Sequence, residues 1–120
     1  CETKEEVLAK ADFVSLHIPA AADGKAVIGA AELALMKESA YLINIARGGL
    51  VDEDALCDAL DAGKLAGAAL DVFAKEPLAN ERVMKHSKIS LTPHIGGSTK
   101  EAQGRIGMEI VDIIKDILPL

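Results

Sequence analysis

The sequence predicts an α/β protein built on a parallel sheet, and three observations lead to this class. Short apolar runs alternate with segments of helical periodicity along the chain, which is typical of βα units. Half of the 120 residues are apolar, enough for the core of one domain. Aromatic residues make up only 2%. The core must therefore consist of Ala, Val, Ile and Leu, which suits a parallel sheet buried on both faces.

The first half of the chain contains two of the expected strands, each preceded by a helix. The segment TKEE has the spacing of a capping box and predicts a helix over Thr3–Lys10. The run FVSLH predicts a strand over Phe13–His17, followed by a loop that contains Pro19. A short helix is expected over Ala31–Lys37, and the unbroken apolar run after it predicts a strand over Tyr41–Ile45.

The second half adds a helix and two more strands. A helix is expected over Asp52–Ala62, because Asp52 is a favourable capping residue, two acids occupy the first turn, and Gly63 follows the end. The run AGAALDV predicts a strand over Ala66–Val72, and its small residues suit close packing by helices. A fourth strand is expected over Lys88–Leu91.

The last expected element is a long amphipathic helix. Ser98 and Glu101 have the spacing of a capping box and predict its start. Apolar residues then recur at helical spacing, at Ala102, Ile106, Ile110, Ile113, Ile114 and Ile117. This stripe predicts that the helix packs against the core.

Composition excludes several classes of function. The net charge of −6 argues against nucleic-acid binding, which requires clustered Lys and Arg. No run of 18 apolar residues predicts a membrane span, and no His, Cys or Asp cluster has the spacing of metal ligands. A disulfide between Cys1 and Cys57 is not expected, which favours a reduced, cytoplasmic chain. Cys57 falls at a packing position of a helix, so we expect no nucleophilic role for it.

The ends of the four expected strands contain most of the residues with chemical potential. The strands end at His17-Ile18-Pro19, at Ala46-Arg47-Gly48-Gly49, at Asp71, which leads to Glu76-Pro77, and at the run Thr92 to Gly97. In parallel sheets, ligands bind beyond the carboxyl ends of the strands. We therefore expect these groups to converge on one crevice.

Three of these side chains form a chemically coherent set. Arg47 follows a buried strand, and its planar guanidinium can bind a carboxylate through two hydrogen bonds. His94 can accept a proton near neutral pH, and Glu76 beside it would fix its tautomer and favour its charged form. Together they suit the oxidation of a hydroxyl group next to a carboxylate. We favour a structural role for His17 and a solvated position for His86.

The segments INIARGGLVDEDAL, AALDVFAKEPL and LTPHIGGST, in this order, resemble the signature motifs of the D-isomer-specific 2-hydroxyacid dehydrogenases. The resemblance extends from ADFVSLHIP to the final helix. The tail GGSTKEAQGRIGMEIVDII is most similar to the D-3-phosphoglycerate dehydrogenase branch. The family implies a Rossmann-type doubly wound fold, NAD as cofactor, a small 2-hydroxy or 2-keto acid as substrate, and a homo-oligomer.

The resemblance also implies roles for single residues. Arg47 would bind the substrate carboxylate and carbonyl, His94 would be the general acid/base, and Glu76 would support His94. Asp71 matches the aspartate that holds the nicotinamide carboxamide. The remaining cofactor contacts would be made by Ile18, Pro19, Ile45, Ala46, His94, Gly96 and Gly97.

One expected motif is missing. No G-x-G-x-x-G sequence occurs in residues 1–120, although this motif binds the cofactor pyrophosphate. We therefore interpret residues 1–120 as the carboxyl-terminal portion of a NAD-binding domain, without its glycine-rich first half and without the substrate domain. Such a portion is expected to bind NAD weakly, to be inactive alone, and to self-associate through an uncovered sheet. The choice between NAD and NADP stays open.

Two other functions remain open. Some proteins with these motifs act as NAD-sensing, corepressor-like interaction modules. Alternatively, the chain is a fragment with no activity of its own. Turnover of small 2-keto acids by the full-length protein would distinguish an enzyme from an interaction module.

Overall fold

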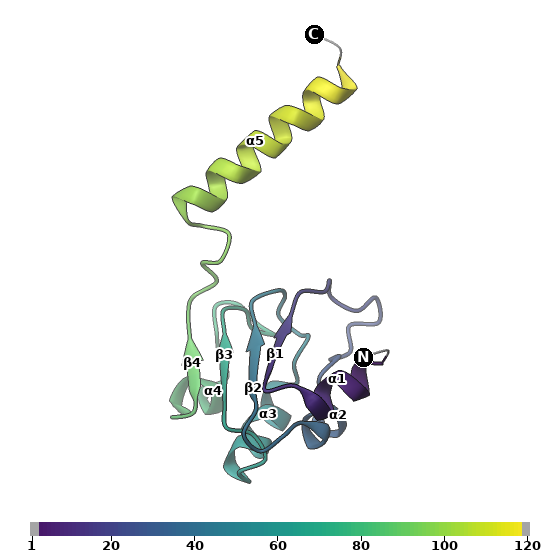
Figure 1. Cartoon of the computed structure of the whole chain (residues 1–120). Helices are drawn as coiled ribbons and strands as arrows, with labels where there is room; N and C mark the ends of the chain where they lie inside the picture. Colours follow the sequence, from purple (N-terminus) through teal and green to yellow (C-terminus); the bar gives the residue numbers. More distant parts are fainter. Residues whose placement is uncertain (1–2, 119–120) are drawn as a thin grey trace.

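Helices and strands alternate throughout residues 3–118, the part of the chain that the computed structural model describes (Figure 1). In chain order the elements are α1 (Lys4–Lys10), β1 (Phe13–Leu16), α2 (Ala30–Leu35), β2 (Tyr41–Asn44), α3 (Glu53–Asp61), β3 (Gly67–Leu70), α4 (Glu81–Lys85), β4 (Ile89–Leu91) and α5 (Lys100–Ile117). This alternation confirms the predicted α/β class. Each predicted strand is present, shortened by one to three residues at its ends.

The four strands form one parallel sheet in the order β1-β2-β3-β4. Their register places Leu16 opposite Asn44, Asn44 opposite Leu70, and Leu70 opposite Leu91. These are the last residues of their strands. The carboxyl ends are therefore flush, and the four loops that follow leave the sheet along one edge.

One face of the sheet carries the core. Side chains in β1 and β2 alternate between exposed and buried, as expected for a strand with one covered face. Helices α1 to α4 pack next to one another in sequence order over this face. The fully buried side chains include Leu8, Leu33, Leu42, Leu56, Leu60 and Val83.

The opposite face is exposed in the described chain. Phe13 and Tyr41 stack there with ring centroids 5.5 Å apart, and they remain 67% and 44% exposed. The expectation of a sheet buried on both faces is therefore wrong for these residues. The expectation that the chain leaves its sheet uncovered is met on this face.

Helix caps follow the sequence at two of the three predicted positions. The Thr3 hydroxyl accepts a hydrogen bond from the backbone N–H of Glu6, and the Asp52 carboxylate accepts one from Ala55. The prediction that Ser98 caps the last helix is wrong. Thr99 is the capping residue, because its hydroxyl accepts from the N–H of Ala102.

Helix α5 extends away from the sheet beyond the carboxyl edge of the strands (Figure 1). Within Lys100–Ile117, which the structure describes in full, Ala102 alone is buried. The prediction that this helix packs against the core is therefore wrong here. Its apolar stripe stays exposed at Ile106, Ile110, Ile113, Ile114 and Ile117, by 44–71%. Among residues 3–118, no helix is long and apolar enough to cross a membrane.

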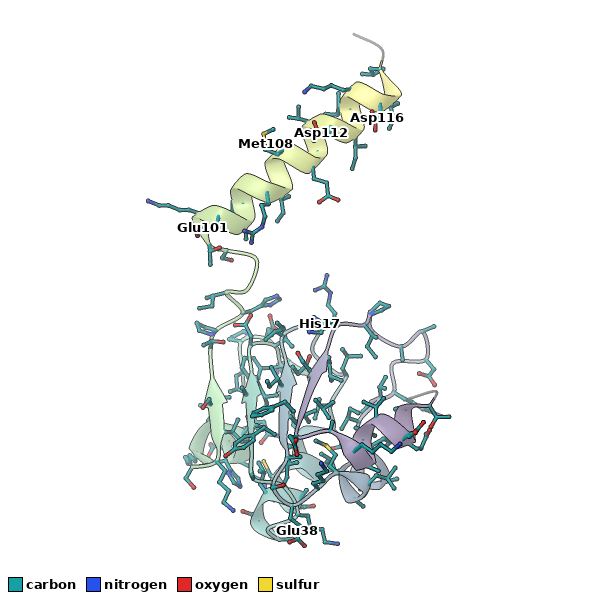
Figure 2. All side chains as sticks on the ribbon, in the orientation of Figure 1. His17, Glu38, Glu101, Met108, Asp112 and Asp116 are labelled. Atoms are coloured by element: carbon teal, nitrogen blue, oxygen red, sulfur yellow. The ribbon has the colours of Figure 1, made fainter. Side chains whose placement is uncertain are left out.

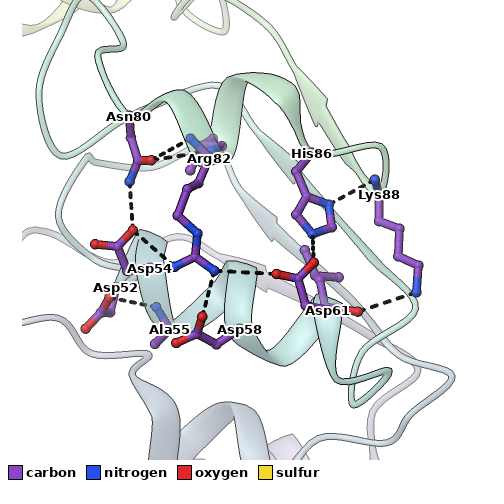
Figure 3. Close-up of polar contacts among 11 residues, drawn as sticks. Asp52, Asp54, Ala55, Asp58, Asp61, Asn80, Arg82, His86 and Lys88 are labelled. Atoms are coloured by element: carbon purple, nitrogen blue, oxygen red, sulfur yellow. Dashed lines mark hydrogen bonds and ion pairs between the residues drawn. The ribbon is translucent and has the colours of Figure 1, made fainter.

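Polar side chains join the short helix α4 to α3 (Figure 3). The Arg82 guanidinium lies 2.6 Å from an Asp58 oxygen and 3.5 Å from an Asp61 oxygen. His86 Nε2 lies 3.0 Å from Asp61 Oδ1, and the His86 side chain is only 11% exposed. The expectation that His86 is solvated is therefore wrong. Exposed ion pairs of this kind contribute little stability each, but together they align α4 with α3.

We predict that the 120-residue chain self-associates as its concentration rises, because α5 exposes an isoleucine stripe. Ile113→Glu should reduce the association, measured as the weight-average mass in multi-angle light scattering. Lys115→Gln is the control, since it changes the net charge by the same amount on an already polar position. A monomer at high concentration in the unmodified chain would contradict the prediction.

Candidate active site

The loops that carry the predicted site residues all leave the sheet at one edge. The flush register of the strand ends places them there. Figure 2 shows His17 at this edge and Glu38 at the opposite one. Arg47 follows β2, Glu76 follows β3 and His94 follows β4. The three loops therefore begin at one edge, but Arg47 lines one hollow while Glu76 and His94 line another. The convergence of the three side chains on one crevice stays a prediction.

A buried asparagine holds the loop that carries Arg47. Asn44 is 2% exposed, its Nδ2 donates to the Arg47 carbonyl at 3.0 Å, and its Oδ1 accepts from the Ala46 N–H at 3.2 Å. The turn after β2 is thereby fixed from within the sheet. Sequence reasoning missed Asn44, although a polar residue inside the apolar run YLINIA was a signal.

The Arg47 side chain is exposed. Its Nη1 donates one hydrogen bond, of 2.7 Å, to the carbonyl of Ala46. A guanidinium has five N–H donors. Arg47 can therefore bind an anion at this edge and keep its contact with its own backbone.

A hollow of about 390 Å³ lies beside Arg47. It is lined by His17, Ile18, Pro19, Ile45, Ala46 and Arg47. Ile18 and Ile45 expose 43% and 50% of their surface. Four residues predicted to contact a cofactor therefore share one hollow with Arg47. His17, which we expected to be structural, is exposed here, and its Nε2 lies 2.8 Å from the Ser15 hydroxyl.

Glu76 and His94 form a direct pair. His94 Nδ1 lies 2.6 Å from Glu76 Oε2, and the two side chains are 49% and 37% exposed. Glu76 Oε1 also accepts a hydrogen bond from the Phe73 N–H at 3.2 Å. The hydrogen bond with His94, and then that from Phe73, hold the pKa of Glu76 below its ordinary value. Glu76 is therefore ionised at neutral pH and fixes one nitrogen of the imidazole.

The Glu76–His94 pair lines an apolar hollow. The hollow has a volume of about 280 Å³, and Phe73, Leu78 and Leu91 contribute to its lining together with Glu76 and His94. His94 itself has a positive φ of 54°. This left-handed conformation is uncommon for residues other than glycine.

Asp71 anchors the turn that carries His94. It is 4% exposed and accepts three hydrogen bonds: from the Thr92 hydroxyl at 2.6 Å, from the Ile95 N–H at 2.8 Å and from the Gly96 N–H at 2.9 Å. Burial alone would raise the pKa of Asp71, but these hydrogen bonds and the nearby His94 outweigh it and lower the pKa. The predicted contact of Asp71 with a carboxamide stays a prediction.

A glycine brings the Arg47 loop against the Glu76 loop. A Cβ atom added to Gly48 would lie 1.7 Å from the carbonyl oxygen of Phe73, a distance that no side chain can occupy. Gly96 also has a close neighbour, with Asp71 Oδ2 3.1 Å from an added Cβ, whereas Gly97 has open space. Gly48 therefore allows the Arg47 loop to lie in direct contact with the Glu76 loop.

The described residues offer no metal cluster and no activated thiol. Among residues 3–118, no group of three or more His, Cys, Asp and Glu side chains could hold a metal ion. Cys57 is free and buried, and burial raises the pKa of its thiol, which disfavours the reactive thiolate. The expectation that Cys1 is not paired with Cys57 falls on a residue, Cys1, that lies outside the described part of the chain.

Sequence comparison identifies a family for most of the chain. Residues 1–96 match the family described as D-isomer specific 2-hydroxyacid dehydrogenase, NAD binding domain. The D-3-phosphoglycerate dehydrogenase of Synechocystis is 45% identical over 112 residues, covering 93% of this chain and 20% of that protein. The D-3-phosphoglycerate dehydrogenase of Escherichia coli K12 is 48% identical over 110 residues, covering 88% and 27%. The chain thus spans a fifth to about a quarter of these relatives.

Solved structures of the same family share the fold. A glyoxylate reductase from Paecilomyes thermophila superposes with a TM-score of 0.80 at 39% identity, covering 88% of this chain and 32% of that one. The holo form of D-mandelate dehydrogenase from Rhodotorula graminis gives 0.84 at 32% identity, covering 96% and 33%. The predicted Rossmann-type fold is thereby confirmed.

We predict that Gly48→Ala destabilises the chain by about 1–3 kcal/mol, because the new methyl group would overlap the Phe73 carbonyl. The measurement is the free energy of unfolding in denaturant. Gly97→Ala is the matched control, since its added methyl group meets no atom within 4 Å. Equal stability of the two variants would show that the contact is not fixed.

We predict that Asp71→Asn lowers the free energy of unfolding by about 1–3 kcal/mol at pH 7, because an amide cannot accept all three bonds as a carboxylate does. The lowered pKa of Asp71 means that its contribution is present above the unfolded value, about 3.9, and is lost as the pH falls through the lower folded value. The stability difference between the two proteins should therefore shrink below about pH 4. A difference that is constant from pH 7 to pH 3 would contradict this.

Proposed function

Because the chain belongs to the D-isomer specific 2-hydroxyacid dehydrogenase family, we propose that it serves an enzyme that interconverts a D-2-hydroxy acid and its 2-keto acid with NAD. We further propose that residues 1–120 are the carboxyl-terminal portion of its cofactor domain. The small share of each relative that the chain spans supports this division. The substrate domain and the glycine-rich half of the cofactor domain would then lie elsewhere in the full protein.

The observation that carries the proposal is the Glu76–His94 pair. Glu76 Oε2 engages Nδ1 of the imidazole at 2.6 Å, so Nδ1 carries a proton and Nε2 is the nitrogen that can exchange one. In the direction of oxidation, Nε2 accepts the hydroxyl proton of the substrate. The adjacent carboxylate stabilises the imidazolium that forms.

Arg47 supplies the second part of the mechanism. Its guanidinium would bind the substrate carboxylate through a planar pair of hydrogen bonds, which fixes the orientation of the neighbouring carbon. Asn44 fixes the Arg47 backbone and Gly48 sets its distance from the Glu76 segment. The substrate carbon would therefore be held between a cation and a proton acceptor.

The hollow beside Arg47 fits a nicotinamide cofactor in its chemistry. Ile18 and Ile45 are half exposed and offer apolar contact to a flat ring, with Pro19 and Ala46 beside them. When bound, NAD supplies the hydride acceptor. The Gly96–Gly97 turn, anchored by Asp71, would approach the cofactor through its backbone.

We propose 3-phosphoglycerate as the substrate. The support is the name of the curated relatives, D-3-phosphoglycerate dehydrogenase, at 43–48% identity. Solved relatives named glyoxylate reductase and D-mandelate dehydrogenase share the fold at lower identity. Turnover of 3-phosphoglycerate by the full protein, compared with glyoxylate and mandelate substrates, tests this assignment. Absence of turnover with every acid would favour the corepressor-like alternative.

Three expectations remain part of this proposal. The enzyme would be a homo-oligomer, would be cytoplasmic and would bind neither nucleic acid nor membrane. The net charge of −6 supports the absence of nucleic-acid binding. Size-exclusion chromatography of the full protein and cell fractionation would test the first two.

In the full enzyme, we predict that His94→Asn lowers kcat by about 10²–10⁴-fold, because the variant loses general acid/base catalysis. Its affinity for NADH should change little. Arg47→Lys should mainly raise KM for the acid, since an ammonium group lacks the planar fork of the guanidinium. Steady-state kinetics and NADH fluorescence titration measure these effects. Full turnover in His94→Asn would exclude the acid/base role.

A further inference from the structure

A glutamate of α3 contacts the segment that carries Glu76. Glu53 is the first residue of the helix and is partly buried, and its Oε1 accepts a hydrogen bond of 2.7 Å from the Ala74 N–H. Ala74 lies 21 residues further along the chain. No helix or strand is assigned between Leu70 and Glu81, which the structure describes throughout. In this segment the N–H groups of Phe73 and Ala74 donate to side chains, those of Glu76 and Glu53.

The bond from Ala74 adjoins two other contacts of the same segment. The Ala74 N–H belongs to the same peptide unit as the Phe73 carbonyl, which packs against Gly48 of the Arg47 loop. The N–H of Phe73 donates to Glu76 Oε1, while Glu76 Oε2 engages His94. Glu53 thus holds the peptide unit next to the residue that contacts both the Arg47 loop and Glu76.

We propose that Glu53 is a positioning residue for the reaction. It fixes the Phe73–Glu76 segment, and through Glu76 it sets the orientation of His94 relative to Arg47. The inference rests on the acid/base role proposed above for the Glu76–His94 pair. It goes beyond that role by assigning the support of the pair to a residue on a different element.

A purely local role for Glu53 is the alternative. Acids in the first turn of a helix stabilise it through the helix dipole, and both Glu53 and Asp54 occupy that turn. The two side chains nevertheless have different partners. Asp54 contacts Asn80 and Arg82 of the neighbouring α4 region and makes no hydrogen bond or ion pair with the Phe73–Glu76 segment, which the structure describes throughout (Figure 3). Asp54 is therefore a matched control for the charge and the helix position of Glu53.

The first measurement is the pKa of Glu76 in the full 120-residue chain, from carboxyl ¹³C chemical shifts followed by NMR. Loosening the segment weakens the Phe73 and His94 bonds, so Glu53→Ala should raise the pKa of Glu76 toward its ordinary value. Loss of a nearby negative charge alone would lower it. The direction of the change therefore separates positioning from simple electrostatics.

Three further variants complete the test. Glu53→Gln keeps an acceptor for the Ala74 N–H and should leave the pKa of Glu76 near or below the unmodified value. Glu53→Asp keeps the charge but shortens the side chain by one methylene group, so the pKa should rise as in Glu53→Ala. Asp54→Ala should leave it unchanged. If Glu53→Ala does not fold, the opposite responses of Glu53→Gln and Glu53→Asp still decide the question.

The second measurement is turnover by the full enzyme. Glu53→Ala should lower kcat about 10²-fold, the effect expected for a misplacement of about 1 Å, with KM for the acid little changed. Glu53→Gln should restore most of this loss, and Asp54→Ala should have no effect. An unchanged pKa of Glu76 in both Glu53→Ala and Glu53→Asp would overturn the positioning role. Absence of turnover in the unmodified enzyme would instead overturn the proposed function and leave the NMR result valid.

Discussion

The candidate site depends on the register of the parallel sheet. Because Leu16, Asn44, Leu70 and Leu91 lie in one row at the ends of their strands, the chain leaves the sheet four times at the same level. No long side chain is then needed to bring distant residues together. A shift of one strand by one residue would move its loop by about 3.3 Å and would also exchange its buried and exposed faces. A shifted strand would therefore expose its buried side chains, so core packing keeps the four loops at the same level.

Three of the four loops at this edge are each held by a buried or partly buried polar side chain. Asn44 binds the Arg47 turn, Asp71 binds the His94 turn, and Glu53 binds the segment before Glu76. Loops without regular structure must find partners for their backbone N–H and C=O groups. Here those partners come from the sheet and from the start of a helix, which are the stiff parts of the fold. The groups proposed for chemistry are left exposed, while their supports are not.

The sequence predicted the class of the fold, all four strands and the placement of Arg47, Glu76 and His94 on one edge. Apolar periodicity and the parallel-sheet rule are enough for this, because strand ends determine where loops begin. It did not predict Asn44 or Glu53 as supports, because their roles depend on which backbone groups lie within reach. Helix α4 was missed since its five residues are too few to establish a period. The polar neighbours of His86 in sequence predict a solvated side chain, whereas this side chain contacts Asp61 of α3 and is only 11% exposed.

The same limit explains the error at the last helix. An isoleucine stripe predicts that a helix is covered, but it does not identify the covering surface. In residues 3–118 helix α5 extends away from the sheet and its stripe is exposed. The start of the helix was misplaced by one residue because Ser98 and Thr99 are both good caps, and only the geometry selects Thr99.

The backbone conformation of His94 limits which amino acids can replace it. With φ at 54°, the site tolerates Gly, Asn, Asp and His far better than it tolerates branched side chains such as Val or Ile. Of those four, only histidine has an ordinary pKa near neutrality. The backbone conformation thus disfavours most amino acids at position 94, whatever their capacity to transfer a proton. A lineage that lost the imidazole would most readily acquire asparagine or glycine there.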